Sequence, residues 1–288
     1  MRTAFKSLEL GLSLLQQDNI LRNIKAVKRY VASELDPSTN YESSWDFIRA
    51  AMHHDLVGVS HSKTEPEIIW YDKDQEKFSY ALRNLAGDVD ISEISSFSNE
   101  YRKIHEESYY NALRRFEEYF PETFVAFKEL IAFIIFAKRS GYGGGTVSNR
   151  IGLIWLAPEN YWSEDDWLEN LVHEFIHNVL FLEDMVHTVF TAGGDRLSEE
   201  DALAISAIRQ VKRGYDKSYH SAFVSFGIIE HYLQLGKKEK ALTFLDPLTI
   251  CVDDLVKNTN FITEHGKQLL FELAKQIVKT REFLKGKV

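Results

Sequence analysis

The chain has 288 residues, 44% of them hydrophobic, so it can bury one large core or two modest ones. Its formal net charge of -9 argues against non-specific nucleic-acid binding, because a polyanion would be repelled. The only cysteine, Cys251, has no partner for a disulfide within the chain, which fits a reducing compartment. No apolar run approaches the ~20 residues that a membrane span needs. We therefore expect a soluble, cytoplasmic protein with no nucleic-acid or membrane partner.

The first 129 residues are predicted to form a helical lobe, whose default role is to grip a substrate. Residues 1–10 interrupt their apolar side chains with Lys6 and Glu9, which is typical of an amphipathic helix and not of a signal peptide. Turn-forming residues crowd positions 36–40 and mark a helix boundary. The apolar pattern predicts helices over residues 5–15, 20–31 and 97–118, a strand over residues 67–71, and a helix that begins at Pro121.

Two candidate strands follow, separated by a glycine-rich segment. Residues 130–137 are rich in β-branched and aromatic side chains, which favours a buried strand, and residues 150–156 repeat the pattern. Between them lies Gly141-Tyr-Gly-Gly-Gly145, so the two strands are predicted to form a hairpin. The glycines lack the Lys-Ser/Thr ending of a phosphate-binding loop. They are interpreted either as a plain flexible turn or as a turn at the rim of an active site, where glycine allows close approach.

Helices dominate the remaining sequence. Ser163 is a good capping residue, and the acids after it suit the positive end of a helix dipole, so a helix is predicted from here to Leu180. Further helices are predicted over residues 199–213, 217–235, 238–246 and 261–284. Residues 130–288 are expected to form the catalytic region. The alternative is one continuous globule that includes residues 1–129.

Within the helix that follows Ser163, the segment His173-Glu174-Phe-Ile-His177 places two histidines at positions i and i+4. Both imidazoles can therefore point at one metal ion, with the Glu174 carboxylate beside an open position of that ion. Apolar neighbours indicate a largely buried helix, in which unpaired imidazoles would be costly without a metal. The alternative is a set of hydrogen-bonded polar residues in the core. We expect a mainly α (α+β), zincin-like fold with a small antiparallel sheet beside the metal-binding helix.

A catalytic metal site usually takes three protein ligands, so a third must come from elsewhere. The candidates are Glu199, Glu200, Asp184, His187 and His220. The two glutamates lie where thermolysin-like peptidases supply a ligand, although acids there also favour a helix start. Asp184 and His187 follow the motif closely, but the chain lacks the glycine and the histidine spacing of the metzincin pattern there. His220 has apolar neighbours that indicate burial, and a buried histidine is commonly a hydrogen-bonded residue of the core. Spacing alone leaves all of these open.

Three segments together resemble one enzyme family. They are Ser148-Asn-Arg-Ile-Gly-Leu-Ile-Trp-Leu156, Leu171-Val-His-Glu-Phe-Ile-His-Asn-Val-Leu-Phe-Leu182, and the block from Arg213 to Val224 that contains His220. Residues 147–227 are thereby similar to the HExxH-type 2-oxoglutarate-dependent peptide β-hydroxylases, which modify ribosomally made precursor peptides. The resemblance covers less than a third of the chain and does not extend to the first 130 residues. It implies Fe(II) held by His173, His177 and His220, 2-oxoglutarate as cosubstrate, and a precursor peptide as the partner.

In the oxygenase interpretation, the distal carboxylate of 2-oxoglutarate needs a cation, and a bidentate arginine fits best. Arg213, seven residues before His220, is expected about two helical turns away on the same face. Arg150, near the glycines, is the other candidate for this role. The alternative for each arginine is an ordinary surface position with no role in binding. Glu174 has no obligatory role as a base in this chemistry. It would instead hold a ligand histidine or a water molecule.

Two alternatives use the same motif. If the metal is Zn(II), Glu174 is the general base for a zinc-bound water, and the protein is a peptidase. The other alternative is a non-enzymatic, metal-stabilised helical binding module. It requires a closed site of four ligands, completed for instance by His187 or Glu200.

Overall fold

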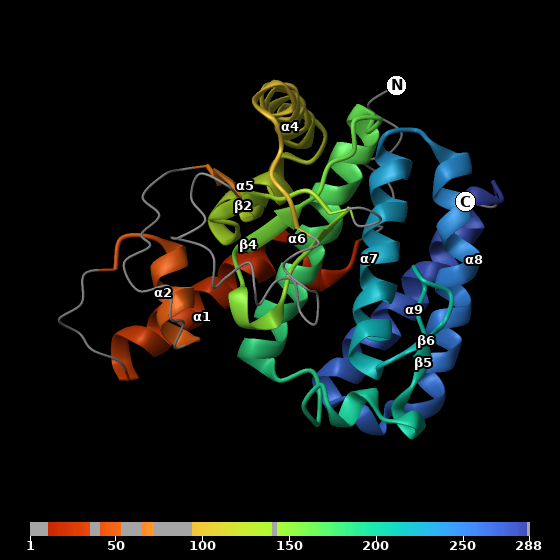
Figure 1. Cartoon of the computed structure of the whole chain (residues 1–288). Coiled ribbons are helices and arrows are strands. Elements are labelled where there is room, and N and C mark those ends of the chain that lie inside the picture. The colour runs from red at the N-terminus through yellow and green to blue at the C-terminus, as the bar shows by residue number, and fades with distance from the viewer. Residues whose placement is uncertain (1–10, 35–40, 53–64, 72–93, 140–142, 287–288) are drawn as a thin grey trace. The chain divides into compact units, whose positions relative to one another are not determined.

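The computed structural model describes residues 11–34, 41–52, 65–71, 94–139 and 143–286, which are mainly helical with a small sheet (Figure 1). The chain divides into two compact units. One consists of Gln17–Leu182, and the other combines Met1–Gln16 with Glu183–Val288. The boundary expected between residues 129 and 130 lies inside the first unit. The predictions for residues 1–10 and 36–40 lie outside the described residues. The described remainder of the helix predicted over residues 5–15 contains only the short 3-10 helix Ser13–Leu15, so that part of the prediction is wrong.

The sheet of the Gln17–Leu182 unit has the strand order β1-β2-β4-β3. Its strands are β1 (Glu67–Trp70), β2 (Phe133–Phe136), β3 (Gly144–Gly145) and β4 (Leu153–Leu156). The three longer strands are parallel, and β3 pairs antiparallel with β4 at the edge of the sheet. All three predicted strands are present, but the predicted hairpin of β2 with β4 and the purely antiparallel sheet are wrong. Residues 137–152 are long enough for the crossover that parallel strands require.

Both faces of β2 and β4 are buried, which explains why these two strands are apolar throughout. One face packs on Trp45 of α2 (Ser44–Ala51), whose ring meets that of Phe133 edge-on at 5.3 Å. Side chains alternate along a strand, so Phe136 points to the opposite face. There it contacts Tyr109 of α4 (Asn99–Tyr119) and Trp167 of α6 (Glu164–His187). The sheet is therefore a central layer between helices.

Helices α1 (Gln17–Glu34), α4 and α5 (Pro121–Leu130) of this unit begin close to the predicted positions, whereas no helix was predicted at α2. Helix α1 buries the apolar positions of the 20–31 pattern and packs on α2 and on α5. Helix α2 begins with a reciprocal capping arrangement of Ser43 and Asp46. Pro121 opens α5 as predicted, at a position that needs no backbone N–H donor. None of the described helices is long and apolar enough to cross a membrane.

In the other unit, α7 (Tyr215–Gln234), α8 (Lys238–Leu255) and α9 (Glu264–Leu284) pack side by side (Figure 1). Helix α7 is central, with almost every residue from Ser218 to Leu233 buried. Helix α8 runs through Pro247 and is therefore longer than predicted. Burial of Leu245, Leu248 and Cys251 on either side of the proline offsets the hydrogen bond that it cannot donate.

The helix predicted over residues 199–213 is wrong. Two short 3-10 helices, Arg196–Ser198 and Glu200–Ala202, precede a hairpin of β5 (Ala204–Ile205) and β6 (Lys212–Arg213). Neighbouring helices take up the backbone groups here, because Ser218 Oγ donates to the Ala204 carbonyl and the Ile205 N–H donates to Asp254. Tertiary hydrogen bonds thus override the local helix propensity of this segment.

Candidate metal centre

Helix α6 carries the histidine motif and begins where the sequence predicts. The Asp166 N–H donates to Ser163 Oγ at 3.3 Å, while Asp166 Oδ2 accepts from the Ser163 N–H at 2.8 Å. This reciprocal cap satisfies donors that the first turn leaves open. Arg115 of α4 binds Glu164 and Asp165 at 3.1 and 3.3 Å and fixes the same end. The helix continues past the predicted end at Leu180 to His187.

His173 and His177 lie side by side on α6, with ring centroids 5.0 Å apart, as the i, i+4 spacing predicts. Both residues are half-buried, whereas Val172, Phe175 and Ile176 around them are buried. The two imidazoles therefore occupy the more accessible side of a largely buried helix. The sequence argument that fully buried imidazoles require a metal does not hold, because these rings keep access to solvent. What favours a shared ion is their proximity.

Glu174 is the buried member of the motif, at 4% exposure. Its Oε2 has no hydrogen-bond partner among the described residues, and its Oε1 lies 3.9 Å from Nε2 of His173. Burial raises the pKa of this carboxyl group to about 8. A buried polar atom without a hydrogen-bond partner costs free energy. A metal-bound water beside His173 would supply the missing donor, so this carboxyl group suits a metal centre.

Gly144, in the described end of the glycine-rich segment, lies directly beside Glu174. A Cβ atom at Gly144 would lie 2.7 Å from the carbonyl oxygen of Trp155 and 3.3 Å from Oε1 of Glu174. Only a residue without a side chain fits between β4 and the motif helix. Gly144 and Gly145 are therefore a strand at the motif and not a plain flexible turn. Because β3 is the edge strand, its outer side pairs with no other described strand.

Asn178, which the sequence analysis did not single out, fixes the connection between β3 and β4 to α6. Its Oδ1 accepts from the Gly152 N–H at 2.8 Å, and its Nδ2 donates to Thr146 Oγ1 at 3.1 Å and to the Glu174 carbonyl at 2.9 Å. The residue is completely buried. Its position directly after His177, on a face that is otherwise apolar, was the available signal. It determines how β3 and β4 meet the motif.

His220 lies on α7 in the other unit and is buried, as its neighbours predict. Its ring is nearly parallel to that of Phe190, at 6.0 Å between centroids. Burial lowers the pKa of the imidazole to about 3, so the ring is neutral at physiological pH, which is the form that binds metals. Its participation at the same ion as His173 and His177 stays a prediction.

The other candidate ligands have different roles in the structure. Asp184 accepts from the N–H groups of Val189 and Phe190 at 2.7 and 3.2 Å and so fixes the chain after α6. Glu199 is exposed and pairs with Arg196 at 3.2 Å, and Glu200 is exposed in a 3-10 helix. His187 contacts a different carboxylate, described below. None of these contacts places a candidate ligand of this group, Asp184, His187, Glu199 or Glu200, next to the motif histidines.

The two candidate arginines differ from expectation. Arg213 is exposed on β6, before α7 begins at Tyr215, so the prediction that it shares a helical face with His220 is wrong. Arg150 is buried at the end of a 3-10 helix, where its Nη1 donates to the carbonyl of Asn149. It lies within the segment that Asn178 fixes to α6. Of the two, only Arg150 belongs to the same unit as His173 and His177.

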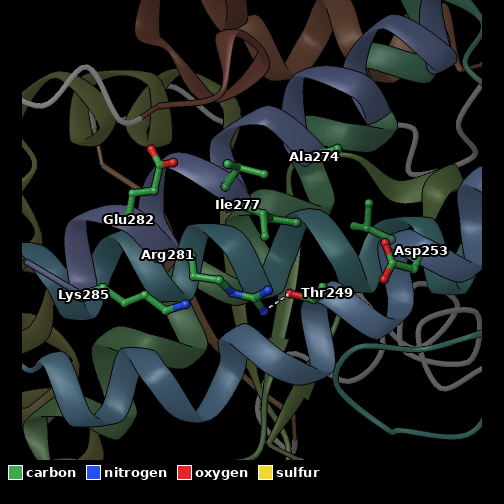
Figure 2. Close-up of a pocket in the computed structure, with 9 residues that line it drawn as sticks. Thr249, Asp253, Ala274, Ile277, Arg281, Glu282 and Lys285 are labelled. Atoms are coloured by element: carbon green, nitrogen blue, oxygen red, sulfur yellow. Dashed lines mark hydrogen bonds between the residues drawn. The ribbon is translucent and has the colours of Figure 1, made fainter. Parts of the chain in front are cut away.

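A groove of about 460 Å³ lies between α8 and α9 and contains none of the predicted site residues (Figure 2). Its apolar floor includes Val252 and Ile277. Arg281 crosses the groove and donates to Thr249 at 2.9 Å and to Asp246 at 3.1 Å. The cation is thus already engaged with α8, and the groove has no chemistry in common with the motif.

With the side chains as they stand, no three or more His, Cys, Asp or Glu residues in the described part of the chain are arranged as a ready-made metal site. The donor chemistry of His173 and His177 nevertheless suits iron or zinc, because imidazole is a preferred ligand of both. No protein-family model matches the sequence, and no match was found among curated proteins.

Proposed function

We propose that the chain is a zincin-like Fe(II)- and 2-oxoglutarate-dependent oxygenase that hydroxylates the β-carbon of a residue in a ribosomally made precursor peptide. One observation carries the proposal: His173 and His177 stand together on the accessible side of α6, beside the buried Glu174 and the glycine strand β3. The resemblance of residues 147–227 to peptide β-hydroxylases supports iron over zinc.

The ligands that we propose are His173, His177 and His220. The neutral state of the buried His220 imidazole is the state that a ligand needs. We propose Arg150 for the distal carboxylate of 2-oxoglutarate, because it is buried in the segment that Asn178 fixes to the motif helix. An arginine held there can bind a carboxylate through two parallel hydrogen bonds. The exposed Arg213 lacks such support.

The peptide would bind along β3. This strand is at the edge of the sheet, and an extended peptide can add to such an edge through backbone hydrogen bonds. Gly144 and Gly145 present no side chains, so the peptide backbone can approach closely. The glycine strand passes Glu174, which would bring a substrate residue to the histidines of the neighbouring turn. A strand of two residues gives little affinity alone, so further peptide contacts are required.

The metal would couple hydroxylation of the peptide to oxidative decarboxylation of the cosubstrate, so that 2-oxoglutarate, dioxygen and peptide yield succinate, carbon dioxide and hydroxylated peptide. The protein contributes position and exclusion of water. Glu174 would orient His173 or a water molecule through its otherwise unpartnered Oε2. Arg150 would fix the cosubstrate, and β3 would fix the peptide.

A zinc peptidase is the second candidate, and the unpartnered Oε2 of Glu174 is the observation that favours it. A carboxylate beside His173 and next to an edge strand is suitably placed to take a proton from a metal-bound water that attacks a peptide. In that reaction Glu174 is indispensable. In the oxygenase it is a positioning residue, so its replacement by glutamine separates the two.

The test is turnover of 2-oxoglutarate by protein that is loaded with Fe(II). We expect succinate formation that requires His173 and His177, and one added oxygen atom in a bound peptide. Glu169→Gln, one turn before His173 on the same helix, is the matched control and should remain active. Cleavage of peptides by the zinc-loaded protein, abolished by Glu174→Gln, would establish the peptidase instead.

A further inference from the structure

We propose that Glu183, His187 and His265 form a second site for a divalent transition metal, independent of the His173–His177 motif. Glu183 and His187 share the last turns of α6, and His265 lies in the first turn of α9. The Oε1 atom of Glu183 lies 2.7 Å from Nε2 of His265 and 4.0 Å from Nε2 of His187. The two rings are 4.8 Å apart between centroids. Two imidazoles and one carboxylate are thus neighbours in the fold, although their donor atoms do not stand in the arrangement of a metal site.

The distances between the Glu183 oxygen and the two histidine nitrogens differ by less than about 1 Å from those expected at a metal centre. A tetrahedral ion with bonds of ~2.0–2.1 Å places its donor atoms about 3.3–3.4 Å apart. The two oxygen–nitrogen separations, 2.7 and 4.0 Å, lie on either side of this value. The Glu183 carboxylate is hydrogen-bonded to Nε2 of His265. Rotation of these side chains would bring both oxygen–nitrogen separations to that value.

The backbone that carries these residues is already fixed. The N–H and Oγ1 of Thr263 donate to the carbonyl oxygens of Val189 and Thr188 at 2.9 and 2.6 Å. Gly266 allows this contact, because a Cβ atom there would lie 2.7 Å from the Val189 oxygen. Tyr219 of α7 donates its hydroxyl to the Gly266 carbonyl. The segment after α6 and the start of α9 are therefore held together, so only side chains need to move.

Exposure and charge also suit a bound cation. Glu183 is buried at 2% exposure and anchors the group, whereas the His187 and His265 side chains are 39% and 32% exposed. An ion can enter from solvent, and water can complete its coordination. The C-terminal end of α6 adds the negative end of a helix dipole near Glu183 and His187. Ligands of this kind bind Zn²⁺, Ni²⁺ and Co²⁺.

This site differs from the motif because α6 is unbroken between them. His187 follows His177 by ten positions on the helix, which is about 15 Å along the axis. A side chain cannot bridge that distance to a shared ion. The assignment gives His187 a role in a separate site and does not depend on the function proposed for the motif.

The test measures Zn²⁺ binding by calorimetry to the full chain with His173→Ala and His177→Ala, which removes the motif. We expect one equivalent of Zn²⁺ to bind. Adding either His187→Ala or His265→Ala should weaken that binding by about 10- to 100-fold. Glu264→Gln, which removes the exposed carboxylate next to His265, is the matched control and should leave the affinity unchanged. Replacing Zn²⁺ with Co²⁺ should produce the visible absorption of a low-coordinate ion, which is lost with His265.

Three results would overturn the proposal. One is the absence of Zn²⁺ binding at micromolar concentration in the motif-free chain. Another is binding that persists within about twofold in both His187→Ala and His265→Ala, because the ion would then be held by other residues. The third is an equal loss of binding in Glu264→Gln. His187→Gln and circular dichroism of each variant distinguish the loss of a ligand from the loss of the fold.

Discussion

Replacing Asn178 with alanine tests whether this buried side chain holds the β3–β4 connection to α6. Asn178 makes three hydrogen bonds and has no exposed surface. Its loss leaves the buried Gly152 N–H without an acceptor, at a cost of about 1–3 kcal/mol, and removes two further bonds worth about 1 kcal/mol or less each. We expect the free energy of unfolding to fall by about 2–4 kcal/mol. All five tryptophans lie within Gln17–Leu182, so tryptophan fluorescence during urea unfolding reports on this unit alone.

Asn170→Ala is the matched control on the same helix. Its Nδ2 makes one local bond, to the Asp166 carbonyl, and it should cost less than about 1 kcal/mol. The urea dependence of the unfolding free energy should be the same for both variants, because neither changes the surface that unfolding exposes. The reasoning fails if Asn178→Ala is no more destabilising than Asn170→Ala.

Further outcomes follow from the same contacts. Gly144→Ala should destabilise the Gln17–Leu182 unit by about 1–3 kcal/mol, because its Cβ atom would lie 2.7 Å from a carbonyl oxygen. The Cβ atom of Gly145→Ala would meet its nearest atom at 3.4 Å, so this substitution should cost less. Burial and a neighbouring glutamate of α9 raise the pKa of Glu230 from 4.5 to about 8, so the stability from its protonated form is complete below about pH 4.5 and is lost as the pH rises through 8. Glu230→Gln should therefore change the free energy of unfolding little near pH 4 and raise it by about 1–2 kcal/mol near pH 8. Circular dichroism during urea unfolding measures this difference. An equal effect at both pH values would contradict the prediction. Arg150→Gln should raise the KM for 2-oxoglutarate by more than about tenfold, whereas Arg213→Gln should leave it unchanged, and the reverse order would exchange their roles.

The sequence predicts the long helices well, because each repeats its apolar residues at the helical period. It predicts the strands from short apolar runs that are rich in β-branched and aromatic residues. It does not predict how the strands pair. Residues 133–136 and 153–156 would look the same in a hairpin or in a parallel pair, since both faces are buried in either case. The 199–213 segment fails for a different reason. Its helix-starting acids are evident in the sequence, but the bonds from Ser218 and Asp254 that hold its backbone come from distant positions.

For the candidate site, the histidine spacing was sufficient to place His173 and His177 together. The burial of Arg150 and the exposure of Arg213 were not predictable, because they depend on a 3-10 helix and a hairpin that local patterns do not indicate. The contact of His265 with Glu183 joins residues 82 positions apart, and no periodicity reveals it. Sequence patterns within one helix are thus informative about the site, whereas contacts between elements require the structure.

The central claim is an iron centre on the motif histidines, and the most direct test is the metal and cosubstrate content of protein purified without oxygen. His265→Ala serves as the parent, so that the second proposed site does not contribute. The account predicts one Fe(II) per chain and a visible absorption band on addition of 2-oxoglutarate. The band should be lost in His173→Ala and His177→Ala and retained in Glu169→Gln. A parent protein that binds zinc but neither iron nor 2-oxoglutarate, or a band that survives both histidine substitutions, would contradict it.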